Sequence, residues 1–246
     1  MSQTKWNVKF VVYRQKDGKA PSYQEYMLEV DPEEYVLDGV ERIWAYKDRS
    51  LCFQHACHHS VCGVCGMRVN GVEKLTCITK ICDVTQNGGT LKIDPLRNFP
   101  IVTDLVVDLG PLYSRMETIG AKQIYSLADA PTKPDSIAKS KDKQAQEEFR
   151  LADCIECGCC ISACPIAGTA EEYLGPAVLA AAQLNGLNKS PECLRLVDSE
   201  VGVWRCHSAF ECTAVCPSNG EPGWRIMDLR MQVIGKRITK LFGGSG

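Results

Sequence analysis

The 15 cysteines of this 246-residue chain fall into groups with regular spacing, which limits the folds and sites that the chain can form. So many thiols suit either an oxidising compartment, where they pair as disulfides, or a reducing one, where they bind metal. The first residues, MSQTKWNVKFVVYR, lack the charged start, long apolar run and small-residue cleavage site of a secretory signal. We therefore expect thiolate ligands, and the spacing of each group predicts the metal site it builds.

Composition and short motifs exclude several classes of protein. The 28 Lys plus Arg and 30 Asp plus Glu give a net charge of -2, so no basic field indicates a nucleic-acid partner. No apolar run reaches the roughly 20 residues that a membrane helix needs. The sequence also lacks G-x-S-x-G, H-E-x-x-H, G-x-x-x-x-G-K-[ST] and G-x-G-x-x-G. We expect neither hydrolytic nor nucleotide chemistry in this chain.

The first cysteine group has the spacing of a plant-type [2Fe-2S] ferredoxin. Cys57, Cys62 and Cys65 follow C-x4-C-x2-C, and Cys77 lies beyond a hairpin signal at Asn70 and Gly71. Two irons need four thiolates, which one compact loop and one distant residue supply. A zinc site is the alternative, although zinc ribbons favour two CxxC knuckles.

Histidines and glycines surround these cysteines. His55, His58 and His59 raise the alternative of a Rieske centre, in which two histidines replace two cysteines. Because four well-spaced cysteines already suffice, we expect the histidines to form hydrogen bonds at the surface. Gly63 and Gly66 are expected to leave room for the backbone near the sulfides.

The second group matches the bacterial ferredoxin pattern C-x2-C-x2-C-x3-C-P. It consists of Cys154, Cys157, Cys160 and Cys164, followed by Pro165. In two-cluster ferredoxins the fourth cysteine of this run ligates the other cluster, so a second copy of the pattern is expected.

The second copy has one cysteine missing. It consists of Cys206, Cys212 and Cys216, with Ala209 at the position of the absent thiol. The ferredoxin rule then gives two ligand sets: Cys154, Cys157, Cys160 and Cys216 for [4Fe-4S], and Cys164, Cys206 and Cys212 for the other cluster. Three thiolates leave one corner of a cubane without a protein ligand, which favours [3Fe-4S] over [4Fe-4S] with a bound water or hydroxide.

Four cysteines stay outside these sets: Cys52, Cys82, Cys159 and Cys193. Free cysteine behaves as a small hydrophobic residue, so we expect these four to be buried small hydrophobic residues or bystanders rather than ligands.

Apolar periodicity divides the chain into two halves. Residues 6–13 and 26–30 alternate like strands, residues 36–44 have helical spacing, and residues 67–75 and 90–93 predict a hairpin and a further strand. Later, a polar connection spans residues 128–150, and helical spacing recurs at residues 171–187 and 223–242. We therefore expect two domains, residues 1–110 and residues 111–246.

The order of the motifs resembles the iron-sulfur subunit of succinate dehydrogenase and fumarate reductase. The resemblance covers nearly the whole chain and is most specific at residues 205–208 (RCHS) and 212–217 (CTAVCP). It implies an α+β chain, with an N-terminal β-grasp [2Fe-2S] ferredoxin-like domain followed by an all-helical bacterial-ferredoxin-type domain that holds [4Fe-4S] and [3Fe-4S].

The resemblance also implies partners and a function. A flavoprotein subunit with FAD would interconvert succinate and fumarate, and single electrons would pass through the three clusters to quinone at membrane anchor subunits, which often hold haem b. The chain would be one subunit of a succinate dehydrogenase (quinone) and would perform no substrate chemistry itself. It would lie on the cytoplasmic face of a prokaryotic plasma membrane, held there by the anchor.

The quinone end departs from the family pattern. His207 and Pro165 resemble family positions at the quinone or haem end, although His207 also suits an interfacial hydrogen bond. After Pro165 the chain has Ile-Ala-Gly-Thr at residues 166–169, where ubiquinone-reducing relatives commonly carry tryptophan. We therefore expect menaquinone and a di-haem anchor. Basic residues in the last helix suit either anionic lipid, an anchor subunit or a solvated face: Arg225, Arg230, Lys236, Arg237 and Lys240.

Overall fold

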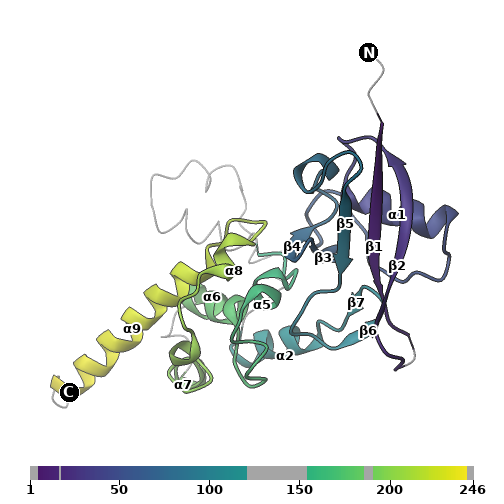
Figure 1. Ribbon diagram of the computed structural model, residues 1–246. Helices are drawn as coiled ribbons and strands as arrows, with labels where there is room; N and C mark the ends of the chain where they lie inside the picture. Colours follow the sequence, from purple (N-terminus) through teal and green to yellow (C-terminus); the bar gives the residue numbers. More distant parts are fainter. Residues whose placement is uncertain (1–4, 17, 121–153, 186–190, 243–246) are drawn as a thin grey trace, which may run out of the picture. The chain divides into compact units, whose positions relative to one another are not determined.

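The computed structural model shows two compact units, one rich in strands and one helical (Figure 1). It describes residues 5–16, 18–120, 154–185 and 191–242. The N-terminal unit comprises Met1–Leu109 and Ile155–Ala163, and the C-terminal unit comprises Gly110–Cys154 and Cys164–Gly246. The predicted polar connection at residues 128–150 lies outside the described residues.

Two long antiparallel strands begin the N-terminal unit. β1 (Trp6–Arg14) pairs with β2 (Ser22–Val30) along its whole length. The prediction of β1 is confirmed to within one residue. β2 begins four residues earlier than predicted. Residues 22–25 are exposed and show no apolar alternation, so the sequence pattern did not indicate a strand there. Pairing with β1 makes them extended.

Three further strands complete a five-stranded sheet of order β2-β1-β5-β3-β4. β3 (Gly66–Val69) and β4 (Val72–Leu75) form the predicted hairpin, and β5 (Thr90–Asp94) runs parallel to β1 and antiparallel to β3. Asn70 and Gly71 connect the hairpin with φ of +50° and +87°. Positive φ at both central residues suits a two-residue turn between twisted strands.

One helix packs on this sheet. Val36, Val40 and Ile43 of α1 (Val36–Tyr46) are fully buried and join a core cluster that includes Phe10 of β1. Their helical spacing explains why the sequence predicted α1 correctly. A helix over a mixed five-stranded sheet is the β-grasp arrangement that the sequence analysis expected.

Short elements fill the rest of the N-terminal unit. They are the 3-10 helix η1 (Ile81–Asp83), the strands β6 (Ile101–Thr103) and β7 (Val106–Val107), and the helix α5 (Cys159–Ala163). β6 and β7 form a separate antiparallel pair, and α5 packs on β4. None of the β6, β7 or η1 elements was predicted, since each is too short to show a period.

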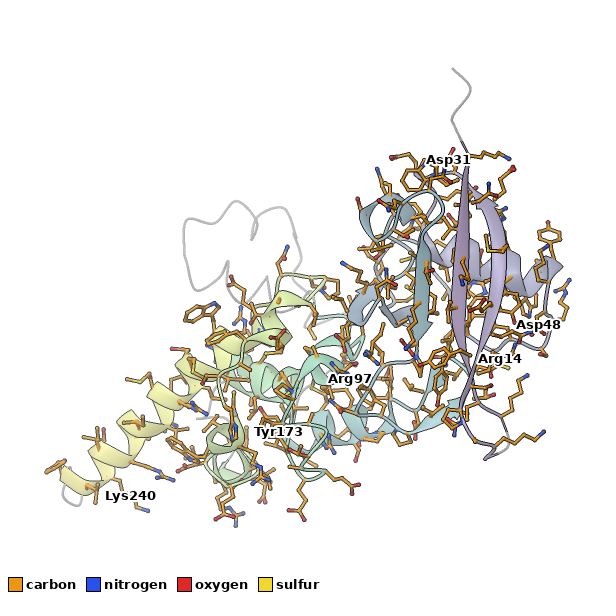
Figure 2. The ribbon with its side chains drawn as sticks, viewed as in Figure 1. Arg14, Asp31, Asp48, Arg97, Tyr173 and Lys240 are labelled. Atoms are coloured by element: carbon orange, nitrogen blue, oxygen red, sulfur yellow. The ribbon has the colours of Figure 1, made fainter. Side chains whose placement is uncertain are left out.

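Charged side chains fix the segment that leads to the first cysteine group. Asp104 has no exposed surface, and its two carboxylate oxygens accept hydrogen bonds from the backbone N–H groups of Gln15 and Cys52, each at 3.0 Å. Arg14 pairs with Asp104. It also pairs with Asp48 (Figure 2). Hydrogen bonds from Ser50 and Arg14 hold the pKa of Asp48 well below its usual range.

The C-terminal unit is helical, and no strand occurs among its described residues. Its elements are α2 (Gly110–Thr118), α6 (Pro176–Asn185), α7 (Pro191–Val197), η2 (Val203–Arg205), α8 (Glu211–Ala214) and α9 (Pro222–Phe242). α6 packs on α9, whose Ile226, Leu229 and Val233 are fully buried. The predicted α+β class, a sheet unit followed by a helical unit, is therefore confirmed.

The predicted bounds of the two C-terminal helices agree with the structure to different extents. α9 begins one residue before the predicted start and ends where predicted. α6 begins five residues later than predicted, because Gly175, with φ of +89°, breaks the helix and Pro176 suits its first turn. Of the described helices, none is long and apolar enough to cross a membrane.

Candidate metal centres

Two segments bring the four cysteines of the first predicted set together: the loop between α1 and β3 carries Cys57, Cys62 and Cys65, and Cys77 follows β4. The thiol of Cys77 lies beside those of Cys65 and Cys57, and the thiol of Cys57 lies beside that of Cys62. Cys65 and Cys77 are buried, while Cys57 and Cys62 are partly exposed. One compact site of four thiols therefore exists within the N-terminal unit.

Backbone amides of this loop point at a thiol. Three N–H groups donate to Cys57 Sγ, those of His59 at 3.3 Å, Val61 at 3.3 Å and Cys62 at 3.4 Å. These hydrogen bonds lower the pKa of Cys57 to about 6, which favours the thiolate that binds metal. Burial raises the pKa of Cys77 to about 11, so binding of metal there would release a proton. The donor set and the inward amides fit a [2Fe-2S] cluster.

Residues near Cys157 occupy the space beside the first loop. Gly63 has φ of +73°, and a Cβ there would lie 2.8 Å from both Ile155 O and Cys157 Cβ. A Cβ at Gly66 would lie 3.2 Å from Cys157 O. Residues 155–157, which lie within the second cysteine group, therefore occupy the space that side chains at Gly63 and Gly66 would fill. A predicted ligand of the second cluster packs directly against the loop of the first.

Replacing Gly63 with alanine is expected to separate these two segments. The positive φ alone costs alanine about 1–2 kcal/mol, and the new methyl group meets backbone that cannot move aside as a flexible side chain does. Gly88→Ala is the matched control, since Gly88 has φ of +75° and nothing within 4 Å of its Cβ position. Urea denaturation of the full chain should give a lower midpoint for Gly63→Ala than for Gly88→Ala, and equal midpoints would contradict the close packing.

Polar contacts anchor the segment Ile155–Ala163 to the sheet. Ser162 Oγ donates to Glu73 Oε1 at 2.8 Å, and Arg97 Nη2 donates to the same oxygen at 3.2 Å. Asn98 Nδ2 donates to Ile161 O at 2.8 Å. Glu73 is only 4% exposed, so this carboxylate lies at the centre of the contact. These bonds explain why the segment joins the N-terminal unit, although the domain boundary predicted from the sequence assigns it to the second domain. The boundary at residues 110 and 111 stays a prediction.

The second predicted set is divided between the two units. Cys157 and Cys160 belong to the N-terminal unit, and Cys154 and Cys216 belong to the C-terminal unit. This set stays a prediction. Cys159 is fully buried, and a hydrogen bond with the Cys157 thiol, together with burial, raises its pKa well above its ordinary value. Its complete burial suits the bystander role predicted for Cys159.

The other three predicted bystanders differ in burial. Cys193 is 3% exposed and behaves as a core residue of the C-terminal unit. Cys52 and Cys82 are partly exposed, and the Cys82 thiol lies 3.6 Å from Glu33 Oε1.

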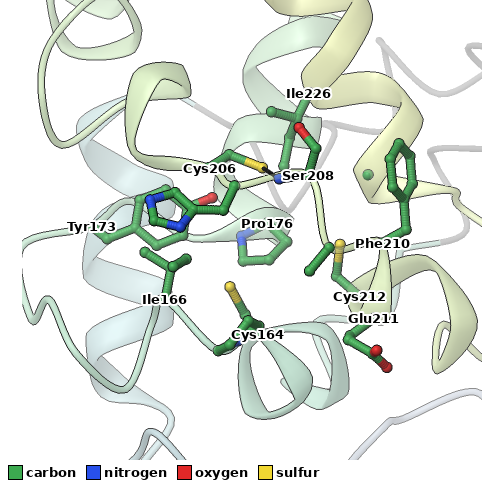
Figure 3. Close-up of a pocket in the computed structure, with 14 residues that line it drawn as sticks. Cys164, Ile166, Tyr173, Pro176, Cys206, Ser208, Phe210, Glu211, Cys212 and Ile226 are labelled. Atoms are coloured by element: carbon green, nitrogen blue, oxygen red, sulfur yellow. Dashed lines mark hydrogen bonds between the residues drawn. The ribbon is translucent and has the colours of Figure 1, made fainter.

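The third predicted set surrounds one cavity of the C-terminal unit. Figure 3 shows the thiols of Cys164, Cys206 and Cys212 around the same space, which is partly open to solvent. Ala209 lines this cavity as well. The residue that replaces the missing cysteine therefore faces the site where a fourth thiolate would be needed.

A buried hydroxyl indicates that this cavity suits a group with hydrogen-bond acceptors. Tyr173 is 1% exposed and lines the cavity, and its Oη forms no hydrogen bond of normal geometry with any described residue. Burial and the neighbouring Cys206 raise its pKa, so the hydroxyl keeps its proton and is able to donate it in a hydrogen bond. Burial also raises the pKa of Cys212 to about 12. Three thiols and one unused donor fit a [3Fe-4S] cluster, whose sulfides accept hydrogen bonds.

Arg230 of α9 supports the Cys206 loop, which sequence reasoning missed. Its guanidinium donates to Val203 O at 2.9 Å, to Cys206 O, and to Ser208 Oγ at 3.3 Å. Two other basic residues of the same helix also bond within the C-terminal unit, Arg225 to Gln183 and Arg237 to Asp198. The spacing of these residues gave no signal of such roles. These three arginines therefore stabilise the C-terminal unit in addition to carrying positive charge.

The two residues predicted at the quinone or haem end lie at the same cavity. Pro165 and His207 both line it, and both are exposed. The structure thus places them beside the third cysteine set, and their role stays a prediction.

Known proteins are similar to this chain over most of its length. Residues 9–114 match the family described as "2Fe-2S iron-sulfur cluster binding domain", and residues 150–219 match that described as "4Fe-4S dicluster domain". The fumarate reductase iron-sulfur subunit of Haemophilus influenzae is 33% identical over 228 residues, 88% of each chain. The mitochondrial succinate dehydrogenase [ubiquinone] iron-sulfur subunit of Candida glabrata is 32% identical over 233 residues, 91% of this chain and 90% of that one.

A solved structure shares the fold. A chain of the Mycobacterium smegmatis Sdh1 complex in the apo form superposes with a TM-score of 0.78 at 22% identity, covering 96% of this chain and 98% of that chain. The similarity in sequence extends across both units and all three cysteine groups. This chain therefore belongs to the family of iron-sulfur subunits of succinate dehydrogenase and fumarate reductase.

Proposed function

We propose that this chain carries [2Fe-2S], [4Fe-4S] and [3Fe-4S] and passes single electrons from an FAD-containing flavoprotein subunit, which oxidises succinate to fumarate, to quinone at a membrane anchor. The observation that carries the proposal is the packing of Cys157, a predicted [4Fe-4S] ligand, against Gly63 in the [2Fe-2S] loop. Clusters held by thiolates exchange one electron at a time, and short separations favour a relay.

The chain's own residues would hold the clusters and tune them. Cys57, Cys62, Cys65 and Cys77 would bind [2Fe-2S], with the amides around Cys57 stabilising its thiolate. Tyr173 would donate to the cluster at the third set. The three sets are Cys57, Cys62, Cys65 and Cys77, then Cys154, Cys157, Cys160 and Cys216, then Cys164, Cys206 and Cys212.

The third set would face the quinone. His207 and Pro165 line the exposed cavity beside it, which supports a quinone or haem end at this place. The absence of tryptophan at residues 166–169 supports menaquinone and a di-haem anchor. The chain would then lie on the cytoplasmic face of the plasma membrane, attached through anchor subunits.

Electron paramagnetic resonance of the intact complex at low temperature tests this function. The oxidised sample should give the near-isotropic signal of a three-iron cluster, because one corner of the third site has no thiolate. Succinate alone should abolish that signal and raise one from reduced [2Fe-2S]. A silent oxidised sample that contains zinc in place of iron would refute the electron-transfer role. Mass spectrometry of the co-purified quinone tests the menaquinone proposal, and ubiquinone alone would contradict it.

A further inference from the structure

Three side chains outside the cysteine sets converge at one point beside the [2Fe-2S] loop. His55 Nδ1 lies 3.1 Å from Glu41 Oε1, His58 Nε2 lies 3.3 Å from the same oxygen, and the two ring nitrogens lie 3.2 Å apart. Glu41 comes from α1, and the histidines come from the loop that follows it. All three belong to the N-terminal unit.

The spacing of these three atoms suits a common metal ion. Zinc bound to imidazole and carboxylate has bonds of about 2.0–2.1 Å, so two ligand atoms at a tetrahedral centre lie about 3.3 Å apart. An octahedral centre with the same bonds would bring neighbouring ligands to about 2.9 Å. The observed triangle, 3.1 to 3.3 Å on each side, lies closer to the tetrahedral value.

Hydrogen bonding does not account for the position of Glu41. Its Oε1 is buried, yet it meets no hydrogen-bond geometry with any described residue, although two ring nitrogens lie within 3.3 Å. A buried carboxylate oxygen normally accepts a hydrogen bond. The two ring nitrogens form a hydrogen bond with each other, and both also lie within 3.3 Å of Glu41 Oε1, so the three potential ligand atoms gather in one small space.

Neighbouring aromatic rings hold the first histidine in place. The His55 ring stacks on Phe53 with ring centroids 5.2 Å apart and planes 19° apart, and Phe53 packs edge-on against Trp44 of α1. The orientation of His55 is thus set by packing, as metal-binding histidines require. His58 and His55 keep side chains 39% and 42% exposed, which leaves a path for an ion from solvent.

We propose that Glu41, His55 and His58 form a binding site for a divalent transition-metal ion of the zinc class, separate from the iron-sulfur clusters. Two imidazoles and one carboxylate are a donor set that such cations prefer, and three protein ligands leave one position for water. The ion would tie the cysteine loop to α1, because its ligands come from both. This site does not depend on the cluster assignment, since none of its ligands is a cysteine.

Zinc binding by the full chain with its clusters loaded tests the proposal. The protein is equilibrated with Zn²⁺ alone at graded micromolar concentrations, separated from unbound metal, and analysed for zinc and iron by mass spectrometry. Wild type should bind one zinc per chain more than Glu41→Gln or His55→Asn, and loss of a ligand should weaken that zinc at least about 100-fold. His58→Asn should do the same, since asparagine tolerates the φ of +58° found there.

His59→Asn is the matched control. It removes a histidine from the same loop but leaves the triad, and its backbone N–H still donates to Cys57 Sγ. It should bind zinc like wild type. Zn²⁺ should raise the midpoint temperature of thermal unfolding of wild type and of His59→Asn, but not that of the three ligand variants. Iron content, measured in the same samples, reports separately on the clusters. If wild type binds no additional zinc, or if all variants bind it equally, the triad is only an ion-paired group and the proposal is wrong.

Discussion

Ala209→Cys is expected to abolish the near-isotropic signal of the oxidised third cluster and to raise the iron content by one atom per chain. The substitution restores the C-x2-C-x2-C-x3-C spacing from Cys206 to Cys216. It also places a thiol on the wall of the cavity that Cys206 and Cys212 already line. A fourth thiolate at that corner would retain the iron that the three-thiolate site loses.

A second cysteine variant separates the position of the new thiol from its mere presence. Ala214→Cys adds a thiol on α8, at an exposed residue that is not part of the cavity lining. Its resonance spectrum and iron content should match wild type. If the three-iron signal survives Ala209→Cys unchanged, then Cys164, Cys206 and Cys212 are not the ligands of that cluster. Loss of the signal in both variants would indicate that any added thiol disturbs the site.

Elements with a local signal were predicted well. The apolar alternation of β1 and the Asn70-Gly71 turn each act over a few residues, so the sequence alone was sufficient. The first half of β2 and the start of α6 were placed wrongly, because strand pairing and the break at Gly175 decided them. The docking of residues 155–163 had no local signal at all. Ser162 and Glu73 are 89 residues apart in the chain, and nothing in either neighbourhood indicates the other.

Spacing alone predicted the cysteine sets, whereas it gave no sign of the residues that support them. The first and third sets each gather at one place, and the second set stays a prediction. Tyr173 and Arg230 reach the third set from a loop and from α9, and isolated polar residues carry no periodic pattern. Glu41 likewise could not be assigned to a site from the sequence pattern. The histidines of the loop were noted, but their carboxylate partner lies on a helix 14 residues before His55 in the sequence.

Glu73→Ala should lower the free energy of unfolding of the N-terminal unit by about 3 kcal/mol, the low end for breaking a buried ion pair. The carboxylate is 4% exposed and receives hydrogen bonds from Ser162 and Arg97. The low end applies because the Arg97 side chain is 51% exposed, so solvent screens part of the attraction. Ser162 has no exposed surface and would lose the acceptor of its hydroxyl, which adds to the cost.

Glu25→Ala is the control for this prediction. Glu25 pairs with Lys9 at 3.4 Å on the exposed face of the sheet, and its side chain is 63% exposed. Removing such a surface pair costs less than about 1 kcal/mol. Urea denaturation gives both values, and hydrogen exchange at Ile161 to Ala163 shows where Glu73→Ala acts. Equal midpoints for the two variants would show that Glu73 does not anchor α5.

The consequence of Glu73→Ala should extend beyond stability, because α5 and the residues before it carry Cys157 and Cys160. When α5 detaches from β4, the backbone of Cys157 loses its fixed place beside Gly63. The [4Fe-4S] signal should therefore weaken in Glu73→Ala, while [2Fe-2S], whose four ligands lie outside this segment, keeps its own. Loss of both signals together would instead mean that the sheet itself unfolds. Loss of the [4Fe-4S] signal alone would show that the hydrogen bond between Ser162 and Glu73, which are 89 residues apart in the sequence, supports the electron relay between the first two clusters.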